Sequence, residues 1–289
     1  MISGYEALRE HAAWLDLSAR GRIYAAGEDR ARLLHAILTN HVQQLKAGEG
    51  CYAFFLNAQG HILADVNLLC MGDRFLLDIE PETRQLVIAH LDKYIIADDV
   101  MLEDVSEVLA CVAVEGPQAE AVMMAAGGPV PAADYAHIAW NAAIVQRAGA
   151  TGGAGFRIFM PAAEKAEYIA RLESAGARAA TAEEARIVRV ENGRPRYGED
   201  IFATTLPQET GQMHAVHFAK GCYLGQEIVE RIRSRGHVNR RLERLEIEGD
   251  TPLARGSRIT TATGEAAEVT TSVYSPGLRK VIALAYVHR

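Results

Sequence analysis

Apolar positions along the chain switch between the period of a helix and the period of a strand, without strict strand–helix repeats, which predicts an α+β fold. Amphipathic stretches with capping residues predict helices at 5–15, 29–38, 81–94, 118–126, 162–176, 182–190 and 225–233. Apolar runs bounded by turn residues predict strands at 22–26, 51–56, 61–70, 74–79, 100–104, 109–115 and 156–160.

The expected organisation has three parts. Residues 1–115 form an N-terminal α+β region, and residues 116–236 form a second α+β region. Residues 237–289 read as about five or six short strands, typical of a small C-terminal antiparallel β-barrel. A chain of 289 residues is long enough for two or three domains, and the sequence leaves open whether the first two regions interleave.

The strand predicted at 61–70 carries polar residues on one face. Alternation places Ile62, Ala64, Val66 and Leu68 on one side, and Leu63, Asp65, Asn67 and Leu69 on the other. Polar groups on an apolar face are either exposed or committed to a partner, because burying them unpaired is costly. Asp65 and Asn67 are therefore candidate site residues, with a solvated strand face as the alternative.

Composition excludes several classes of protein. The net charge of −7 argues against a general nucleic-acid-binding surface, and no direct nucleic-acid partner is expected. No apolar run reaches the roughly 20 residues of a membrane helix, and the N-terminus lacks a secretory pattern, so a cytoplasmic location is expected. The four cysteines, at 51, 70, 111 and 222, are scattered without ligand spacing, so no metal site is expected.

The stretch from Lys220 to Glu227 is compact, polar and followed by a predicted helix. Glycines at 221 and 225 allow backbone conformations or close approaches that a Cβ would block. Cys222 would precede the helix N-terminus with Lys220 two residues away, and both features favour a thiolate. The alternative is a small buried cysteine without chemistry.

The residues Lys-Gly-Cys-Tyr-x-Gly-Gln-Glu at 220–227 resemble the signature of the YgfZ family, folate-binding proteins related in fold to the T-protein (aminomethyltransferase) of the glycine cleavage system. The loop at 189–198 resembles the Arg-x-Glu-x-Gly-x-Pro-x-Tyr-Gly segment of the same superfamily. The resemblance covers most of the chain in order. It implies a T-protein-like folate-binding body with a C-terminal barrel, and tetrahydrofolate or a derivative as cofactor.

The resemblance also implies roles for single residues. Asp65 matches the aspartate beside the reactive N5 of tetrahydrofolate, and Glu191 matches the glutamate that binds the pterin ring. Cys222 would supply a thiol near the ligand. The other residues expected at the ligand are Asn67, Tyr197, Lys220, Gln226, Arg231 and Arg235.

Arginines crowd the span from Arg231 to Arg244, where six stand in an acidic chain. Such a run is most often a solvated face. A folate glutamate tail, which arginine binds in bidentate fashion, is the specific alternative that fits better than RNA phosphates.

The function implied by the resemblance is a tetrahydrofolate-binding protein that supports assembly or repair of iron–sulfur enzymes, including those that modify tRNA. Iron–sulfur client or assembly proteins would then be partners, and the oligomeric state is open, a monomer included. The alternative is an aminomethyltransferase that passes a one-carbon unit from a lipoyl arm to folate. Ala64 stands where T-proteins usually carry a second acidic residue, which favours the first reading. A binding module without chemistry is a third possibility.

Overall fold

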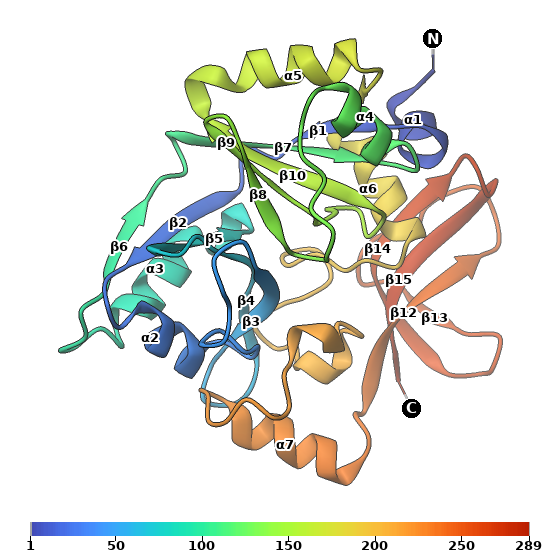
Figure 1. Cartoon of the computed structure of the whole chain (residues 1–289). Coiled ribbons are helices and arrows are strands. Elements are labelled where there is room, and N and C mark those ends of the chain that lie inside the picture. Colours follow the sequence, from blue (N-terminus) through green and yellow to red (C-terminus); the bar gives the residue numbers. More distant parts are fainter. Residues whose placement is uncertain (1, 289) are drawn as a thin grey trace.

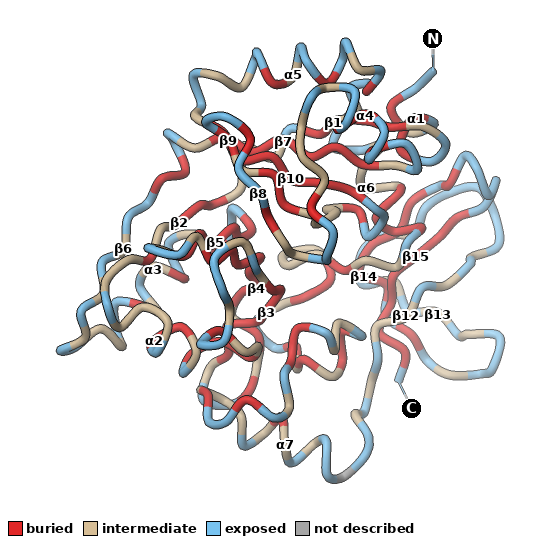
Figure 2. The backbone as a smooth tube through the Cα atoms, in the orientation of Figure 1, coloured by how far each residue is buried: buried red, intermediate tan, exposed pale blue. Residues whose placement is uncertain are grey.

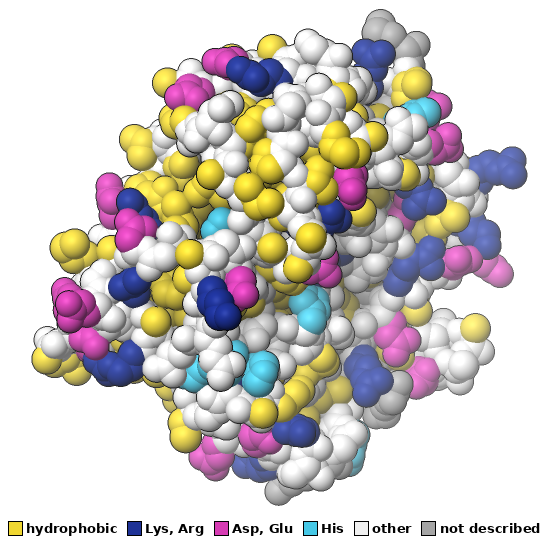
Figure 3. Space-filling model, in the orientation of Figure 1, with side chains coloured by type: hydrophobic (Ala, Val, Ile, Leu, Met, Phe, Trp, Pro, Cys, Tyr) yellow, Lys and Arg dark blue, Asp and Glu magenta, His cyan; other side chains and the backbone are white. Residues whose placement is uncertain are grey.

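Three β-sheets and the helices that cover them surround the centre of the molecule (Figure 1). The computed structural model describes residues 2–288, without the side chain of Arg235. Positive and negative side chains are interspersed over the face seen in Figure 3, in line with the modest net charge. The α+β class and the mixed sheets expected from the sequence are confirmed.

Sheet I forms the wall on which the predicted Asp65 strand lies. Its strands are ordered β3 (Gly50–Leu56), β4 (Ile62–Cys70), β5 (Arg74–Ile79), β2 (Gly21–Ala26) and β6 (Met101–Asp104). One face of the sheet packs against α2 (Arg30–Ile37) and α3 (Arg84–Asp92), which follows the short 3-10 turn η1 (Pro81–Thr83). On β4 that face carries Ala64, Val66 and Leu68, as predicted. Ile62, predicted on the same face, packs instead on the opposite side with Leu56, because a bulge shifts the register between Phe55 and Leu56.

Sheet II packs face to face with sheet I. Its order is β11 (Arg178–Ala179), β1 (Ala13–Asp16), β7 (Leu109–Glu115), β10 (Gly155–Pro161), β9 (Ala143–Gln146) and β8 (His137–Trp140). Its outer face carries α4 (Ala119–Ala125) and α5 (Lys165–Ser174), the latter after η2 (Ala162–Glu164). Strands from both sides of residue 115 therefore share one sheet.

Apolar side chains fill the space between sheets I and II. Leu69 and Leu76 of sheet I meet Cys111 and Phe159 of sheet II, and all four are buried. The strands at the centre of the molecule are accordingly the buried part of the backbone, as Figure 2 shows. Polar residues on these inner faces need hydrogen-bond partners, because leaving a buried polar group unpaired is costly.

Sheet III is formed by the C-terminal residues. Its order is β12 (Arg240–Ile247), β15 (Lys280–His288), β14 (Ala266–Ser275) and β13 (Arg258–Thr260), all antiparallel. One face packs on α6 (Ala182–Glu191), and α1 (Gly4–Glu10) lies against the other side of α6. The remaining short elements are η3 (Pro207–Glu209), η4 (Met213–Ala215) and α7 (Gln226–Arg235).

Two predictions were wrong: the number of strands in the C-terminal region and the end of the first helix. The C-terminal region holds four strands in one sheet, fewer than the predicted five or six, because 248–257 and 261–265 are turns and loops. The helix predicted at 5–15 ends at Glu10, and Ala13–Asp16 instead forms a strand. Both edges of that strand are paired, one with β7 and one with β11, and this pairing outweighs the local helical propensity.

Candidate functional site

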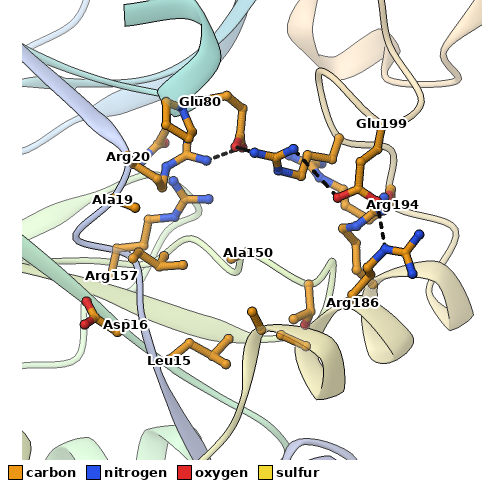
Figure 4. A pocket seen from close by; sticks show the side chains of 18 of the residues that line it. Leu15, Asp16, Ala19, Arg20, Glu80, Ala150, Arg157, Arg186, Arg194 and Glu199 are labelled. Carbon is orange, nitrogen blue, oxygen red and sulfur yellow. Dashed lines mark hydrogen bonds and ion pairs between the residues drawn. The ribbon is translucent and has the colours of Figure 1, made fainter. Parts of the chain in front are cut away.

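A cavity of about 620 Å³ lies between sheet I, sheet II, α6 and the loop that follows α6. Arg20 and Arg157 lie on one side of it, and Arg186, Arg194 and Glu199 lie on the other (Figure 4). Its volume is in the ordinary range for small-molecule sites. The wall thus combines several cationic groups with the apolar surfaces of two sheets.

Asp65 lies on the cavity wall, on the face of β4 predicted from the sequence. Its Oδ2 accepts a hydrogen bond of 2.7 Å from the hydroxyl of Tyr52, while Oδ1 has no hydrogen-bond partner among residues 2–288. Burial raises the pKa of Asp65, the nearby Glu80 carboxylate raises it further, and Arg20 opposes both. One carboxylate oxygen is therefore left for a ligand, on an acid that holds its proton more tightly than usual.

Asn67 is the second predicted residue on this wall. Its Nδ2 donates to Oε1 of Gln146 on sheet II, and Nε2 of Gln146 donates to the carbonyl oxygen of Tyr135. The Oδ1 atom of Asn67 has no hydrogen-bond partner in the described part of the chain. Asn67 therefore joins the two sheets and leaves an acceptor oxygen beside the cavity.

Buried ion pairs hold the sheets together beneath the cavity. Asp78 of β5 is fully buried and accepts from Arg20 and from Arg157 of β10. Burial raises the pKa of Asp78, but the two guanidinium groups outweigh this effect and hold it below its usual range. The pairing fixes Arg157 in place, and its Nε has no hydrogen-bond partner among residues 2–288.

The opposite wall continues this network. Glu80 accepts ion pairs from Arg20 and Arg196, and Arg196 also pairs with Glu82. Glu199 accepts from Arg186 and from Arg189, each at 2.9 Å. With Arg157, five of the arginines that line the cavity are therefore paired with carboxylates.

Arg194 differs from these arginines. Its NH1 donates to the neutral Oε1 of Gln212 at 2.6 Å, and its guanidinium lies 4.7 Å from the centre of the Tyr52 ring. Within residues 2–288 it forms no ion pair with a carboxylate. An anionic group in the cavity would therefore find in Arg194 a cation that is not already neutralised.

Glu191 does not line the cavity, although the resemblance predicts that it binds the pterin. It ends α6 and is buried against α1 and sheet III. Oε1 accepts from the hydroxyls of Tyr5 at 2.7 Å and Ser275 at 2.5 Å, and Oε2 pairs with Arg9 at 3.1 Å. These contacts give the carboxylate a structural role between three elements.

The predicted Lys220–Glu227 motif caps the end of α2. Lys220 is buried, and its Nζ donates to the carbonyl oxygens of His35 and Leu38, the latter at 2.6 Å. The backbone N–H of Leu224 donates to the carbonyl of Ala36. Donors from the motif thus satisfy carbonyls that the helix end leaves unpaired. Burial lowers the pKa of Lys220 to about 8.

Gly225 explains how the motif approaches the Asp65 hairpin. Its φ is +78°, and a Cβ there would come within 2.6 Å of the carbonyl oxygen of Asn57. The predicted need for glycine at this close approach is confirmed. Cys222 is exposed and does not line the cavity, while the ammonium of Lys220 is hydrogen-bonded to α2.

The remaining predicted ligand residues lie outside the cavity lining. Tyr197 packs with Ile201 and Tyr223, and the side chain of Gln226 accepts from the N–H of Tyr223. Arg231 is exposed on α7, and the side chain of Arg235 is outside the described residues. The arginines that stand close together in the sequence are spread over α7 and β12.

Sequence reasoning missed the cavity arginines and their partners. Arg157 and Asp78 each stand within an apolar strand, between Phe156 and Ile158 and between Leu77 and Ile79. Charged residues of opposite sign within buried strands were the available signal, because such groups need one another.

No helix in 2–288 is long and apolar enough to cross a membrane. One exposed group of possible metal ligands is found in this range, formed by Glu6, Glu10 and His11 on and beside α1, away from the cavity.

Among known proteins, this chain resembles aminomethyltransferases in sequence and in fold. A family model described as the GCVT N-terminal domain matches residues 1–220. An aminomethyltransferase of Rubrobacter xylanophilus is 32% identical over 98% of this chain and 78% of its own length, and one of Geobacillus kaustophilus is 31% identical over 98% and 81%. The glycine cleavage system aminomethyltransferase T of Bartonella henselae has a similar fold, with a TM-score of 0.87 at 24% identity over 99% of this chain and 80% of that one.

These similarities correct the main functional prediction. Support of iron–sulfur enzymes was expected from the Lys220–Glu227 motif, with the aminomethyltransferase as the alternative. The relatives that match nearly the whole chain are named as aminomethyltransferases, so the alternative is favoured and the iron–sulfur role was wrong. In the structure, residues of the motif serve the contact between α2, the hairpin and α7.

Proposed function

The chain belongs to the GCVT family, and from this premise we propose that it is a tetrahydrofolate-dependent aminomethyltransferase. The observation that carries the proposal is Asp65, with one oxygen held by Tyr52 and the other without a partner among residues 2–288, on the wall of the cavity. The names of the relatives supply the reaction type.

The reaction transfers a one-carbon unit to folate. N5 of tetrahydrofolate attacks the carbon of an aminomethyl thioether, and ring closure by N10 leaves a methylene bridge. Ammonia and the free thiol depart, and they take up the two protons that N5 and N10 lose. Asp65 is the acid–base group placed to exchange a proton at the cavity wall, since its pKa is raised toward the working range.

The cavity also suits the rest of a folate molecule. Apolar surface and the Tyr52 ring accompany the polar atoms of Asp65 and Asn67, which match the mixed donors and acceptors of a pterin. Arg194, which has no carboxylate partner in the described chain, would bind the glutamate carboxylate. This assignment replaces the sequence cluster around Arg231 as the proposed tail site.

Ala64 does not count against this function. It lies on the opposite face of β4 from Asp65 and is fully buried against α2 and α3. A side chain at this position points away from the cavity, because successive residues of a strand face opposite sides. The departure from the usual acidic residue therefore leaves the proposed catalytic wall unchanged.

As a finer assignment we propose that the chain is a YgfZ-like member of the family, because its Lys220–Glu227 stretch resembles the signature of that group. Its supporting observation is the motif itself, which here anchors the α7 N-terminus against the hairpin. This subgroup assignment concerns descent and does not alter the proposed reaction. Cys222, exposed beside α7, is given no part in it.

Calorimetric titration with tetrahydrofolate under anaerobic, reducing conditions tests the ligand. The reaction is tested by formation of methylenetetrahydrofolate from an aminomethyl-loaded lipoyl carrier protein, with Asp65→Asn as the inactive control. We expect saturable one-to-one binding, and turnover that Asp65→Asn lowers by about 10²–10⁴-fold. Binding without turnover by the wild-type protein would overturn the transferase proposal, and absence of binding at millimolar ligand would overturn the folate site.

A further inference from the structure

A second cavity, of about 440 Å³, lies between α7, the 208–218 segment and the start of β12. In Figure 1 the chain rises from the end of α7 to β12, and the cavity lies beside this connection. None of the residues that line it lines the cavity of Asp65. Its volume also suits a small molecule.

The charge of this cavity is one-sided. Arg233 and Arg241 line it, and no aspartate or glutamate is among the described residues that do. Arg241 is exposed, and its side chain makes no hydrogen bond or ion pair with a described residue. Arg233 pairs with Glu230 at 3.4 Å, outside the lining, so Arg241 is the lining arginine that no described carboxylate neutralises. In a chain whose net charge is −7, this cation marks a local anion site.

The rest of the lining is apolar. Met213, Phe218, Ile232 and Val238 contribute side chains, and the guanidinium of Arg233 lies 4.4 Å from the centre of the Phe218 ring. The arginine is thus held against an aromatic surface, which keeps it at the cavity and preserves its charge. A ligand here would meet apolar contacts and a cationic pair together.

Gln208 adds an independent sign of a ligand. It lines the cavity, and its Nε2 donates to the carbonyl oxygen of Val229 at 2.8 Å. Its Oε1 is buried and has no hydrogen-bond partner within residues 2–288. Buried amide oxygens are nearly always satisfied, so a donor from a bound molecule is the natural partner.

We propose that this cavity is a second binding site, for a small amphipathic carboxylate that also carries an N–H or O–H group to donate to Oε1 of Gln208. Its carboxylate is bound by Arg233 and Arg241, and its apolar part contacts Phe218 and Ile232. The inference goes beyond the proposed transferase function and does not depend on it.

The test uses 8-anilinonaphthalene-1-sulfonate, a fluorescent amphipathic anion, on the full chain. We expect saturable binding at one site that octanoate displaces and octan-1-ol does not. R241Q and the double variant R233Q/R241Q should weaken binding by about tenfold or more, whereas R258Q, an exposed arginine on β13, should not. Because Arg241 makes no described side-chain contact, R241Q removes the charge without breaking an interaction of the fold.

Tetrahydrofolate is the second arm of the same experiment. Saturating tetrahydrofolate should leave the probe bound, since the two cavities share no lining residue. Displacement by tetrahydrofolate, equal binding by wild type and the double variant, or absence of saturable binding would each overturn the second site. A protein that fails to bind tetrahydrofolate still gives a decisive result with the probe.

Discussion

Tyr52 and Asp65 are joined across neighbouring strands by a hydrogen bond of 2.7 Å from the tyrosine hydroxyl to Oδ2 of the carboxylate. In the register of β3 and β4, Tyr52 stands opposite Asn67, so the bond runs diagonally along one face of sheet I. The bond orients the carboxyl group and leaves Oδ1 without a partner among residues 2–288. Orientation of the acid is therefore a property of the sheet register.

Tyr52→Phe tests this orientation. The ring still packs in the apolar cluster of Phe54 and Tyr223, so the fold should be retained. Without the hydroxyl, Asp65 loses the donor that stabilises its charged form, and kcat should fall by about 10–100-fold with the Kd for tetrahydrofolate changed by less than about threefold. The pH profile should move to higher pH. An unchanged profile would show that Tyr52 does not act on Asp65.

Asp65→Asn should make the protein more stable at neutral pH while it abolishes turnover. The folded-state pKa of Asp65 is raised, mainly by burial, so the folded protein holds this proton more tightly than the unfolded chain. The stability from that proton is present at low pH and is lost as the pH rises through the raised pKa. An asparagine at position 65 does not titrate, so the variant does not lose stability in this way as the pH rises.

The stability difference between Asp65→Asn and wild type should therefore grow as the pH rises above about 4, the ordinary range of an aspartate pKa. Urea unfolding at a series of pH values measures it, with Asp134→Asn as an exposed control. A difference that stays constant over this range would contradict the raised pKa.

The sequence predicted the Asp65 wall but only a part of the site. Period-two alternation placed Asp65 and Asn67 on one face of β4, because the rule depends only on local geometry. Arg20, Arg157 and Arg194 come from three distant segments, and no local pattern indicates that they meet. The sequence also could not show that Arg231 lies outside this cavity while Arg233 and Arg241 line a different one.

Local sequence patterns also could not predict which side chains are buried in contacts between distant elements. Glu191 could be placed at the end of a helix from the sequence, but its partners Tyr5 and Ser275 lie 186 and 84 residues away. In β14 the register with β15 shifts between Val269 and Thr271, which leaves Thr270 in a bulge. Thr270 and Thr271 both donate to Oδ1 of Asp200, which only the folded chain reveals.

Arg194→Gln tests how an anionic ligand is held. The variant removes the cavity cation that has no carboxylate partner among the described residues. Affinity for tetrahydrofolate should fall by about 10–100-fold, because a charge-assisted bond to the glutamate carboxylate is lost. Tetrahydropterin, which lacks the glutamate, should bind both proteins alike. Equal losses for both ligands would place Arg194 at the pterin instead.

Glu191→Gln separates the role implied by the resemblance from the role that the contacts support. Glu191 accepts from Tyr5 and Ser275 and pairs with Arg9, so the amide should lower the free energy of unfolding by about 1–3 kcal/mol. Tetrahydrofolate affinity of the folded variant should change by less than about threefold. A loss of affinity above tenfold with unchanged stability would restore Glu191 as the pterin ligand.

Lys220→Met should loosen the contact between α2 and the motif without touching the cavity. Methionine keeps the apolar stem of the side chain but removes both hydrogen bonds to the carbonyl oxygens of His35 and Leu38. Two buried acceptors are then left unsatisfied, so the free energy of unfolding should fall by about 2–4 kcal/mol. Hydrogen exchange should rise at the amides of 217–224 and stay unchanged in β10.

Tetrahydrofolate affinity measured on the folded fraction should be retained, because Lys220 does not line the cavity. Weaker binding at unchanged stability would instead make Lys220 part of the ligand site.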